Sequence, residues 1–332
     1  MLVWLGLMGV LTQEACMNVD GTNAGPGGKP AGSPASAEQK PAGPGTPSAE
    51  PDLAAPPITL EVFPEYMIGF PMLVAITCEN PTAKSTFYNL PEANIFTAPG
   101  PIEFIFTSPD GKRIVLPAAS PRHKETARGF TLRPGEARRM LFDISGLEPS
   151  LEPGPYRLEA IYRLKSGSST SPPAQVRITT PAPEDARAAA TLKRENDTGE
   201  PSWSQFIEAN WRTVDAAKLS AKGREALAYH LFLHRAIYGP ARVRDLELGR
   251  LEAFARGPLA GEAAVLRLEI LAARGAQTAA EEAAILKQWP GLRWRIDEIK
   301  AGGGLLASLR RTLGAEQEFD KKPDFYPYTT KP

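Results

Sequence analysis

The sequence predicts a multidomain protein in which an all-β region is followed by an all-α region. Over residues 58–180, short apolar runs alternate with period two and are separated by Pro, Gly and Asn, which is typical of β-strands. Over residues 184–318, apolar residues recur at helical spacing. The 332 residues suffice for two domains of ordinary size, and we expect each region to bury a core of its own.

Charge and cysteine content exclude several classes of protein. The chain carries 38 basic and 38 acidic residues, and the β-rich and helical regions are each close to neutral. Neither region offers the positive surface that a nucleic-acid backbone requires. The two cysteines cannot form a disulfide framework or a four-ligand zinc site. We predict no nucleic-acid partner and no cofactor.

The N-terminus has the features of an export signal. Residues 2–11 form an unbroken apolar run that would be about 15 Å long as a helix, which is too short to span a bilayer. The length suits the apolar segment of a secretory signal, and Cys16 follows five residues later. Because no Lys or Arg precedes the run, a short apolar start that packs on the protein is the alternative.

A cysteine after such a run, followed by a stretch rich in Pro, Gly, Ala and Ser over 17–57, resembles a bacterial lipoprotein precursor. The resemblance implies a leader over 1–16, lipidation of Cys16, and a periplasmic or outer-membrane-anchored protein of a Gram-negative bacterium. Membrane contact would be limited to this anchor. Gln13 and Glu14 depart from the family's pattern of Leu and small residues before the cysteine. The tether contains no aromatic residue, so we expect it to stay disordered.

Seven or eight short strands are predicted in the β-rich region, with Asp110-Gly111 as a hairpin turn. No helical period interrupts them, and their number and spacing fit a two-sheet sandwich. The runs are 58–63, 73–78, 101–107, 113–116, 130–132, 139–144, 156–164 and 175–179.

The segment 151–160, with Pro-Gly-Pro before Tyr156, resembles the corner into the sixth strand of immunoglobulin-like and fibronectin type III domains. In those domains a tyrosine hydroxyl ties the turn to nearby backbone. Residues 132–136 and the strand ending at 143–144 also resemble bacterial members of the class, including a small proteinase-inhibitor-like β-domain. The resemblance implies an immunoglobulin-like β-sandwich over 58–180 and says little about function.

Four residues of the β-rich region are of interest for chemistry or binding. Cys78 lies mid-strand among apolar neighbours, and we expect a buried free thiol rather than a reactive one. The loop expected from Asn80 to Pro99 carries Phe87, Tyr88 and Phe96. These aromatic side chains either bind a partner or cover an open edge of the core.

Several helices of ordinary length are predicted after Pro183, with Ser202 and Ser220 as N-caps. Gly and Pro punctuate them, and their short connections imply antiparallel neighbours. The clearest segments are 203–217, 222–238, 243–255, 259–274 and 279–289.

The helix from Leu259 is apolar on two faces, which predicts a helix sandwiched between layers. Residues 263–290, with Gly275 at the turn, resemble one tetratricopeptide-type repeat, and Gly239 lies 36 residues before Gly275. The resemblance implies a tetratricopeptide-like domain of antiparallel helical hairpins over 184–318. One face carries Ala263, Leu266 and Ile270, and the other carries Ala264, Val265, Leu268 and Leu271.

His230 and His234 are four residues apart on a predicted helix, which is the spacing of a two-histidine metal site. Leu231 stands where a zinc peptidase would need Glu, and Asp245 and Glu247 are the nearest candidates for a third ligand. The alternative is a pair of ordinary, partly exposed histidines.

A glycine run and an aromatic tail lie near the C-terminus, and each has two interpretations. Residues 302–304 could form an anion-binding nest at a helix start or a flexible helix junction. The tail over 319–332 either caps the helical groove or serves as a docking peptide through Phe325, Tyr326 and Tyr328.

No recognisable catalytic set is present in the sequence, so we expect a non-enzymatic protein. The first hypothesis is an envelope-tethered scaffold that binds a protein or peptide partner. The second is a modulator or inhibitor of an extracellular protease that acts through loops of the β-domain. The third is a metal-dependent enzyme that uses His230 and His234.

Overall fold

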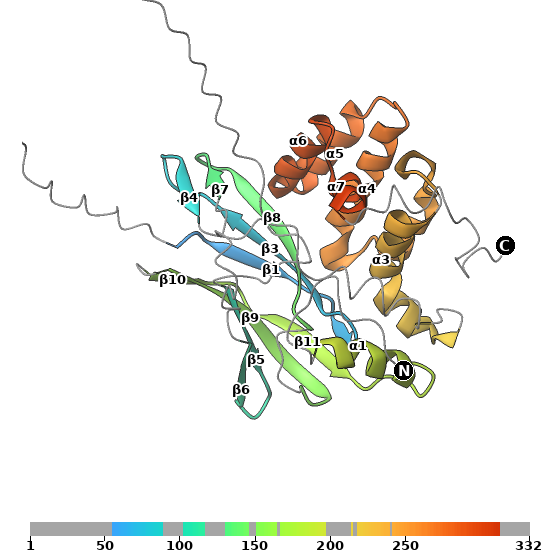
Figure 1. Ribbon diagram of the computed structural model, residues 1–332. Helices are drawn as coiled ribbons and strands as arrows, with labels where there is room; N and C mark the ends of the chain where they lie inside the picture. Colours follow the sequence, from blue (N-terminus) through green and yellow to red (C-terminus); the bar gives the residue numbers. More distant parts are fainter. Residues whose placement is uncertain are drawn as a thin grey trace, which may run out of the picture. The chain divides into compact units, whose positions relative to one another are not determined.

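The computed structural model describes residues 55–88, 102–116, 130–145, 151–164, 167–196, 214, 218–239 and 241–312. It has a β-sheet region over residues 58–179 followed by a helical region (Figure 1). No helix in these ranges is long and apolar enough to cross a bilayer. The predictions for the leader, Cys16, the tether, Phe96, the segment 203–213 and the aromatic tail lie outside the described residues.

Most strands belong to two sheets. The three-stranded sheet has the order β1 (Ile58–Glu61), β3 (Leu73–Glu79), β8 (Ala137–Asp143), and its neighbours are antiparallel. The larger sheet has the order β2 (Glu65–Met67), β11 (Ala174–Thr179), β9 (Gly154–Leu164), β5 (Ile102–Thr107), β6 (Arg113–Leu116), with β10 (Gly167–Thr170) paired to β9. Its β2–β11 pair is parallel. A separate pair joins β4 (Thr86–Tyr88) and β7 (Phe130–Leu132).

The two sheets bury one shared apolar cluster. Because side chains alternate along a strand, Val74, Ile76 and Cys78 of β3 point to the same face. They lie in one cluster with Phe104 of β5 and Tyr162 of β9. All five side chains are fully buried, which explains the apolar positions of the predicted strands.

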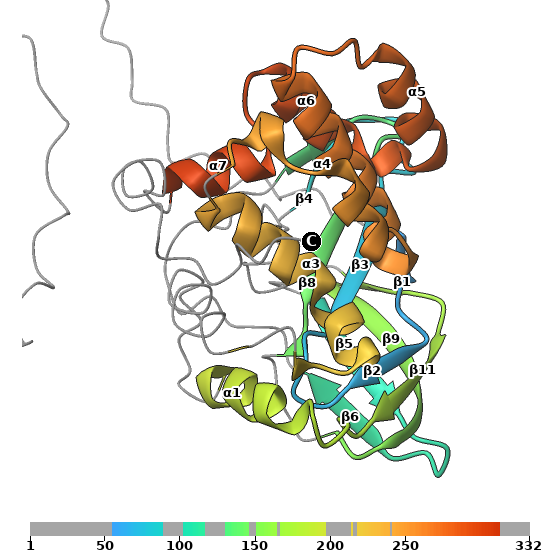
Figure 2. The same ribbon diagram turned by 90° about the vertical axis from the view of Figure 1, so that its right-hand side faces the viewer.

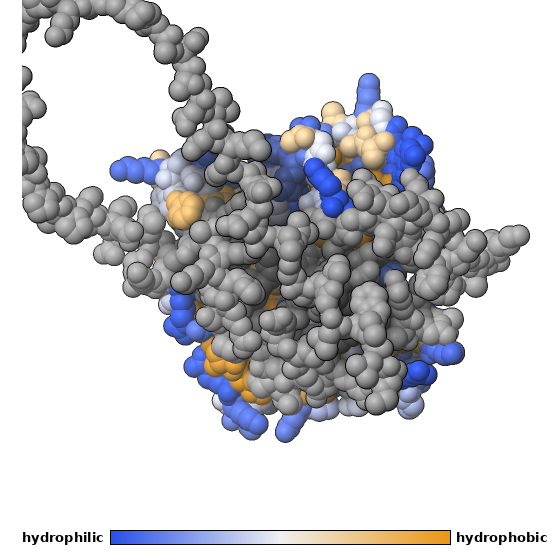
Figure 3. Space-filling view, in the orientation of Figure 1, coloured by the Kyte–Doolittle hydropathy of each residue, from blue (hydrophilic) through white to orange (hydrophobic). Residues whose placement is uncertain are grey.

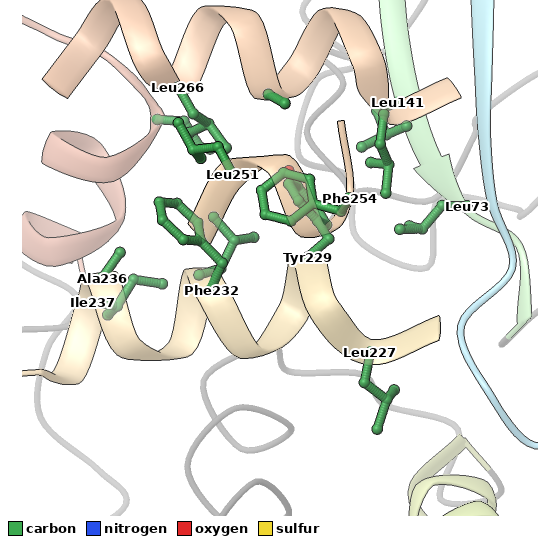
Figure 4. Close-up of a cluster of buried hydrophobic side chains, with 14 of the residues drawn as sticks. Leu73, Leu141, Leu227, Tyr229, Phe232, Ala236, Ile237, Leu251, Phe254 and Leu266 are labelled. Atoms are coloured by element: carbon green, nitrogen blue, oxygen red, sulfur yellow. The ribbon is translucent and has the colours of Figure 1, made fainter. Parts of the chain in front are cut away.

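The opposite face of the three-stranded sheet is buried against the helices (Figure 4). Leu73 of β3 and Leu141 of β8 share a cluster with Tyr229, Phe254 and Leu266 of the helical region. Strands that are buried on both faces are continuously apolar rather than alternating, and β3 follows that rule. The sheet region therefore buries a core of its own, as expected, whereas the expectation of a separate core in the helical region is wrong, because that core includes one face of the sheet.

Helices of the second region pack against this face of the sheet (Figure 2). The α-helices are α1 (Ala186–Asn196), α3 (Ala221–Tyr238), α4 (Ala260–Ala273), α5 (Ala279–Gln288), α6 (Arg293–Lys300) and α7 (Leu305–Thr312). The predicted N-cap of α3 is confirmed, because the Ser220 hydroxyl accepts a hydrogen bond from the Gly223 amide at 2.9 Å.

The predicted helix over 243–255 is wrong. Two 3-10 segments lie there instead, η4 (Val243–Asp245) and η5 (Leu248–Ala253). The Arg274 guanidinium donates to the carbonyls of Arg244 and Leu246, each at 2.7 Å. A side chain from α4 thus satisfies carbonyls that an α-helix would use internally.

The prediction of a doubly buried helix is confirmed in α4. Ala263, Leu266 and Ile270 belong to the cluster that includes β3 and β8. Val265 and Leu268 belong to a second cluster with residues of α5 and α6. Helix α4 therefore lies between the sheet side and the outer helices.

The edge of β8 is covered by η7 (Pro290–Leu292) and α6. The Trp294 indole donates to the Arg139 carbonyl at 3.1 Å. A Cβ at Gly291 would lie 2.8 Å from the Arg139 nitrogen, so only glycine permits this approach. The Arg138 guanidinium lies 4.2 Å from the centroid of Phe130 and 4.1 Å from that of Trp294. Helical backbone and side chains thus protect a sheet edge that has no further strand in the described part of the chain.

The helix start that follows the glycine run 302–304 binds an anion, and the anion belongs to the chain itself. The Glu269 carboxylate accepts from the Ala307 amide at 3.0 Å, and the amides of Leu305 and Leu306 also bond to it. A Cβ at Gly304 would lie 2.5 Å from the Glu269 carboxyl carbon. The start of α7 is therefore occupied by a buried carboxylate, which explains the glycine at 304.

Candidate functional site

A groove lies where the sheet region meets the start of α3. We call it the junction groove, and its volume is about 210 Å³. Its floor is apolar and its rim is charged. The lining residues are Phe63, Glu65, Tyr66, Met67, Pro71, Leu73, Lys222, Glu225, Ala226, Phe254, Arg256 and Leu259.

The floor of the junction groove is held in place by Tyr66. Its hydroxyl donates to the Leu73 carbonyl at 2.7 Å and accepts from the Phe63 amide at 3.0 Å. The Phe63 and Tyr66 rings meet edge to face, with centroids 6.1 Å apart. Burial raises the pKa of Tyr66. The hydroxyl therefore stays protonated at neutral pH and serves to fix the floor.

Two exposed ion pairs form the rim of the junction groove. Lys222 Nζ lies 2.8 Å from Glu65 Oε1, and Arg256 pairs with Glu225. The hydrogen bond from Lys222 lowers the pKa of Glu65, so this carboxylate is charged at neutral pH. Exposed pairs contribute little to stability, so their charges can be shared with a ligand at small cost.

The residue types and the volume of the junction groove suit the binding of an apolar group. Among the described residues, its lining contains no Ser, Thr, Cys, His or Asp. Its volume is below the roughly 300–1,000 Å³ of pockets for drug-sized ligands. One large apolar side chain fits such a space.

The two histidines of α3 are both buried, so the prediction that they are partly exposed is wrong. His230 is 1 % exposed and His234 is 7 % exposed. His230 Nε2 lies 3.7 Å from Asp143 Oδ2. Burial lowers the pKa of His230 to about 4, against the smaller effect of the Asp143 charge. His230 is therefore neutral at pH 7.

Metal ligation by these histidines would need further ligands nearby. Among the described residues, no group of three or more His, Cys, Asp or Glu side chains converges in the way a metal ion needs. Asp143 Oδ1 accepts from the amides of Met72 and Ser145, at 3.1 and 3.0 Å. The expected third ligands, Asp245 and Glu247, pair with the arginines Arg244 and Arg250.

The aromatic residues expected at a partner surface have different environments. Phe87 is 53 % exposed, whereas Tyr88 is 1 % exposed and packs in the core of the sheets. The Tyr88 hydroxyl donates to Asn80 Oδ1 at 3.3 Å. Tyr88 is thus corrected from a candidate binding residue to a core residue, because residues 86–88 form a strand in which alternate side chains face inward.

Figure 3 colours the described residues on one face of the molecule by hydropathy. Among these residues, the apolar surface forms small areas between hydrophilic ones. Phe87 and Val115 are the exposed large apolar side chains of the described ranges. Single exposed apolar residues are normal in soluble proteins. Neither Phe87 nor Val115 by itself therefore defines a candidate site.

Cys78 is a buried free thiol, as predicted. Burial raises its pKa to about 12, which outweighs the opposing effect of Arg138. A thiol with so little thiolate at neutral pH is a poor nucleophile.

No pattern in the sequence identifies the residues of the junction groove as a site. They come from three segments, 63–73, 222–226 and 254–259, that are far apart along the chain. No motif links these segments, because only the folded chain brings them together. The charged residues resemble an ordinary solvated helix face.

Comparison with known proteins gives no family. No family model matches the chain, and no curated protein matches it. A β-glucosidase from Listeria innocua in complex with glucose is 14% identical, with a TM-score of 0.23, and the match covers 37% of this chain and 16% of that enzyme. A second structure of a β-glucosidase from Listeria innocua matches with the same identity, TM-score and coverage. Likenesses at this level carry no argument about fold or function.

Proposed function

We propose that the chain is a non-enzymatic protein-binding or scaffold protein of the bacterial envelope, and that the junction groove binds an apolar side chain of a partner protein. The groove itself is the observation that supports this function. It combines an apolar floor, which Tyr66 holds in place, with a rim of exposed charges. Binding sites for peptides often combine an apolar anchor pocket with a polar rim.

The charges at the rim favour a partner with acidic residues beside its apolar side chain. In both ion pairs the basic side chain is the more exposed member. Lys222 is 73% exposed against 38% for Glu65, and Arg256 is 52% exposed against 46% for Glu225. The cations therefore extend further into solvent, where acidic side chains of a peptide can reach them.

Fluorescence polarisation with labelled peptides tests this function on the full chain. The first peptide has a central Phe flanked by Asp and Glu, the second has Ala at the centre, and the third has Lys in place of the acids. We expect the first to bind at least tenfold more tightly than the other two. Equal binding of the Phe and Ala peptides would reject the proposal.

A matched pair of variants locates the binding. Ala226→Arg places a long side chain in the groove and is expected to weaken binding of the Phe peptide at least tenfold. Ala273→Arg changes an exposed position at the end of α4, outside the groove lining, and should bind as the unmodified protein does. Unchanged binding by Ala226→Arg would place the peptide elsewhere.

The envelope location forms part of the proposal. It is supported by the apolar run at 2–11, by Cys16 and by the tether that follows. Metabolic labelling with a palmitate analogue should mark the protein and fail in Cys16→Ser. Lack of label in both would remove the lipid anchor.

The finer fold classes are also proposals. An immunoglobulin-like sandwich is supported by the apolar cluster between the two sheets and by the Tyr156 hydroxyl, which donates to the Glu152 carbonyl at 3.0 Å. A tetratricopeptide-like arrangement is supported by the α4–α5 hairpin, whose turn contains Gly275 at φ 75°.

We do not extend the proposal to a protease modulator or to a metal-dependent enzyme at His230 and His234. No contact or cavity in the described ranges favours either function over peptide binding.

A further inference from the structure

A second, smaller cavity lies inside the junction of sheet and helices. Its volume is about 10 Å³, and it is lined by residues of β8, η6 (Gly257–Leu259), η7, α3, α4, α6 and α7. Its polar lining comes from Arg139, Tyr229, Glu262 and Arg295, with Pro258 beside them. Of these elements only β8 belongs to the sheet, and the others come from the helical region.

Two buried polar groups that line this cavity have no hydrogen-bond partner in the part of the chain that the structure describes. They are the Tyr229 hydroxyl and Arg295 Nη2. Tyr229 is 1% exposed and Arg295 is 5% exposed. The other terminal nitrogen of Arg295 donates to Glu262 Oε1 at 2.6 Å. Buried polar groups are nearly always satisfied, so each of these two groups calls for a partner.

The chemistry of the two groups limits what that partner can be. An arginine nitrogen can only donate, and burial raises the pKa of Tyr229 so that its hydroxyl remains a donor. Arg295 Nη2 therefore needs a hydrogen-bond acceptor, and the Tyr229 hydroxyl can donate to the same acceptor atom. A cation cannot be that acceptor, and a cavity of this volume holds no more than one water-sized molecule.

We propose that a single buried water molecule binds in this cavity and accepts hydrogen bonds from the Tyr229 hydroxyl and Arg295 Nη2. Its own hydrogens would be donated to oxygens of the lining, for which Glu262 and Pro258 are available. A buried water typically makes two to four hydrogen bonds, and this site offers two donors and two acceptors. The water connects α3 to α6 directly behind β8. This inference is independent of the junction groove and of any partner.

A crystal structure of the full chain tests the proposal directly. We expect a density peak within about 3.2 Å of both Tyr229 Oη and Arg295 Nη2. In Tyr229→Phe the peak should be lost or displaced. No peak, or a direct hydrogen bond between the two side chains, would overturn the proposal.

The sign of a stability change provides a second test in solution. If the water accepts from Tyr229, Tyr229→Phe removes a hydrogen bond and should raise the unfolding equilibrium constant about fivefold. Tyr162→Phe is the matched control, because the Tyr162 hydroxyl is also buried without a partner among the described residues but does not line the cavity. The control should be neutral or stabilising. A Tyr229→Phe variant that is as stable as this control would contradict the proposal.

Discussion

Arg295→Met is expected to lower the free energy of unfolding by about 3–5 kcal/mol, because it leaves Glu262 buried without its partner. The two side chains form an ion pair at 2.6 Å, and each is 6% exposed. The substitution keeps the volume of the site similar and removes only the charge and its hydrogen bonds. Urea unfolding followed by circular dichroism measures the change.

The double variant Glu262→Leu with Arg295→Met is the matched control. Replacement of a whole buried ion pair by apolar residues of similar volume is often neutral or stabilising. We therefore expect the double variant to recover most of the stability that the single variant loses. If both variants are equally unstable, the loss comes from packing rather than from the unpaired carboxylate.

Stability should fall as the pH is lowered from about 6.5 to about 4, and His230 should account for much of this fall. Burial holds its pKa at about 4 in the folded protein, whereas an unfolded histidine has a pKa of about 6.5. Over this range the unfolded chain takes up a proton and the folded chain does not. The stabilisation is therefore complete above pH 6.5 and is lost on acidification, by up to about 3 kcal/mol.

Comparison with His230→Gln isolates this contribution. Asp143 is the charged group opposite His230, and it remains in both proteins. Glu269, whose pKa is raised by burial, changes stability in the opposite direction on acidification and is also unchanged. The unmodified protein should show a steeper loss of unfolding free energy between pH 6.5 and 4 than His230→Gln. Parallel curves would show that His230 does not titrate in this way.

Features set by local sequence could be predicted. The cap at Ser220, the burial of Cys78 and the two apolar faces of α4 depend on side chains close in the chain, and each is confirmed. The hydrogen bond from Tyr156 to the carbonyl of Glu152 is a local contact of the same kind.

Features set by contacts between distant segments could not be predicted. The 3-10 segments at 243–253 depend on a guanidinium that is about thirty residues away in sequence. The Arg295–Glu262 pair was missed because charged residues on a helix usually face solvent. The junction groove and the buried cavity both require α3 to pack on the sheet.

The sequence contains one signal for the core that the sheet shares with the helices. Residues 73–78 are almost continuously apolar, which indicates a strand that is buried on both faces. With the larger sheet on one face, such a strand needs a second cover on the other. The helices provide it, which explains why the core of the helical region includes side chains of the sheet.

Equilibrium unfolding of the full chain, followed by two probes, tests this shared core most directly. All five tryptophans lie outside residues 58–180, so tryptophan fluorescence reports on the chain beyond the sheet region, including Trp289 and Trp294 of the helices. Amide hydrogen exchange of β3 and β9 reports on the two sheets. We predict that both probes give the same urea midpoint, because β3 and β8 lose half of their cover when the helices unfold. Sheet amides that stay protected after the fluorescence change is complete would contradict the account.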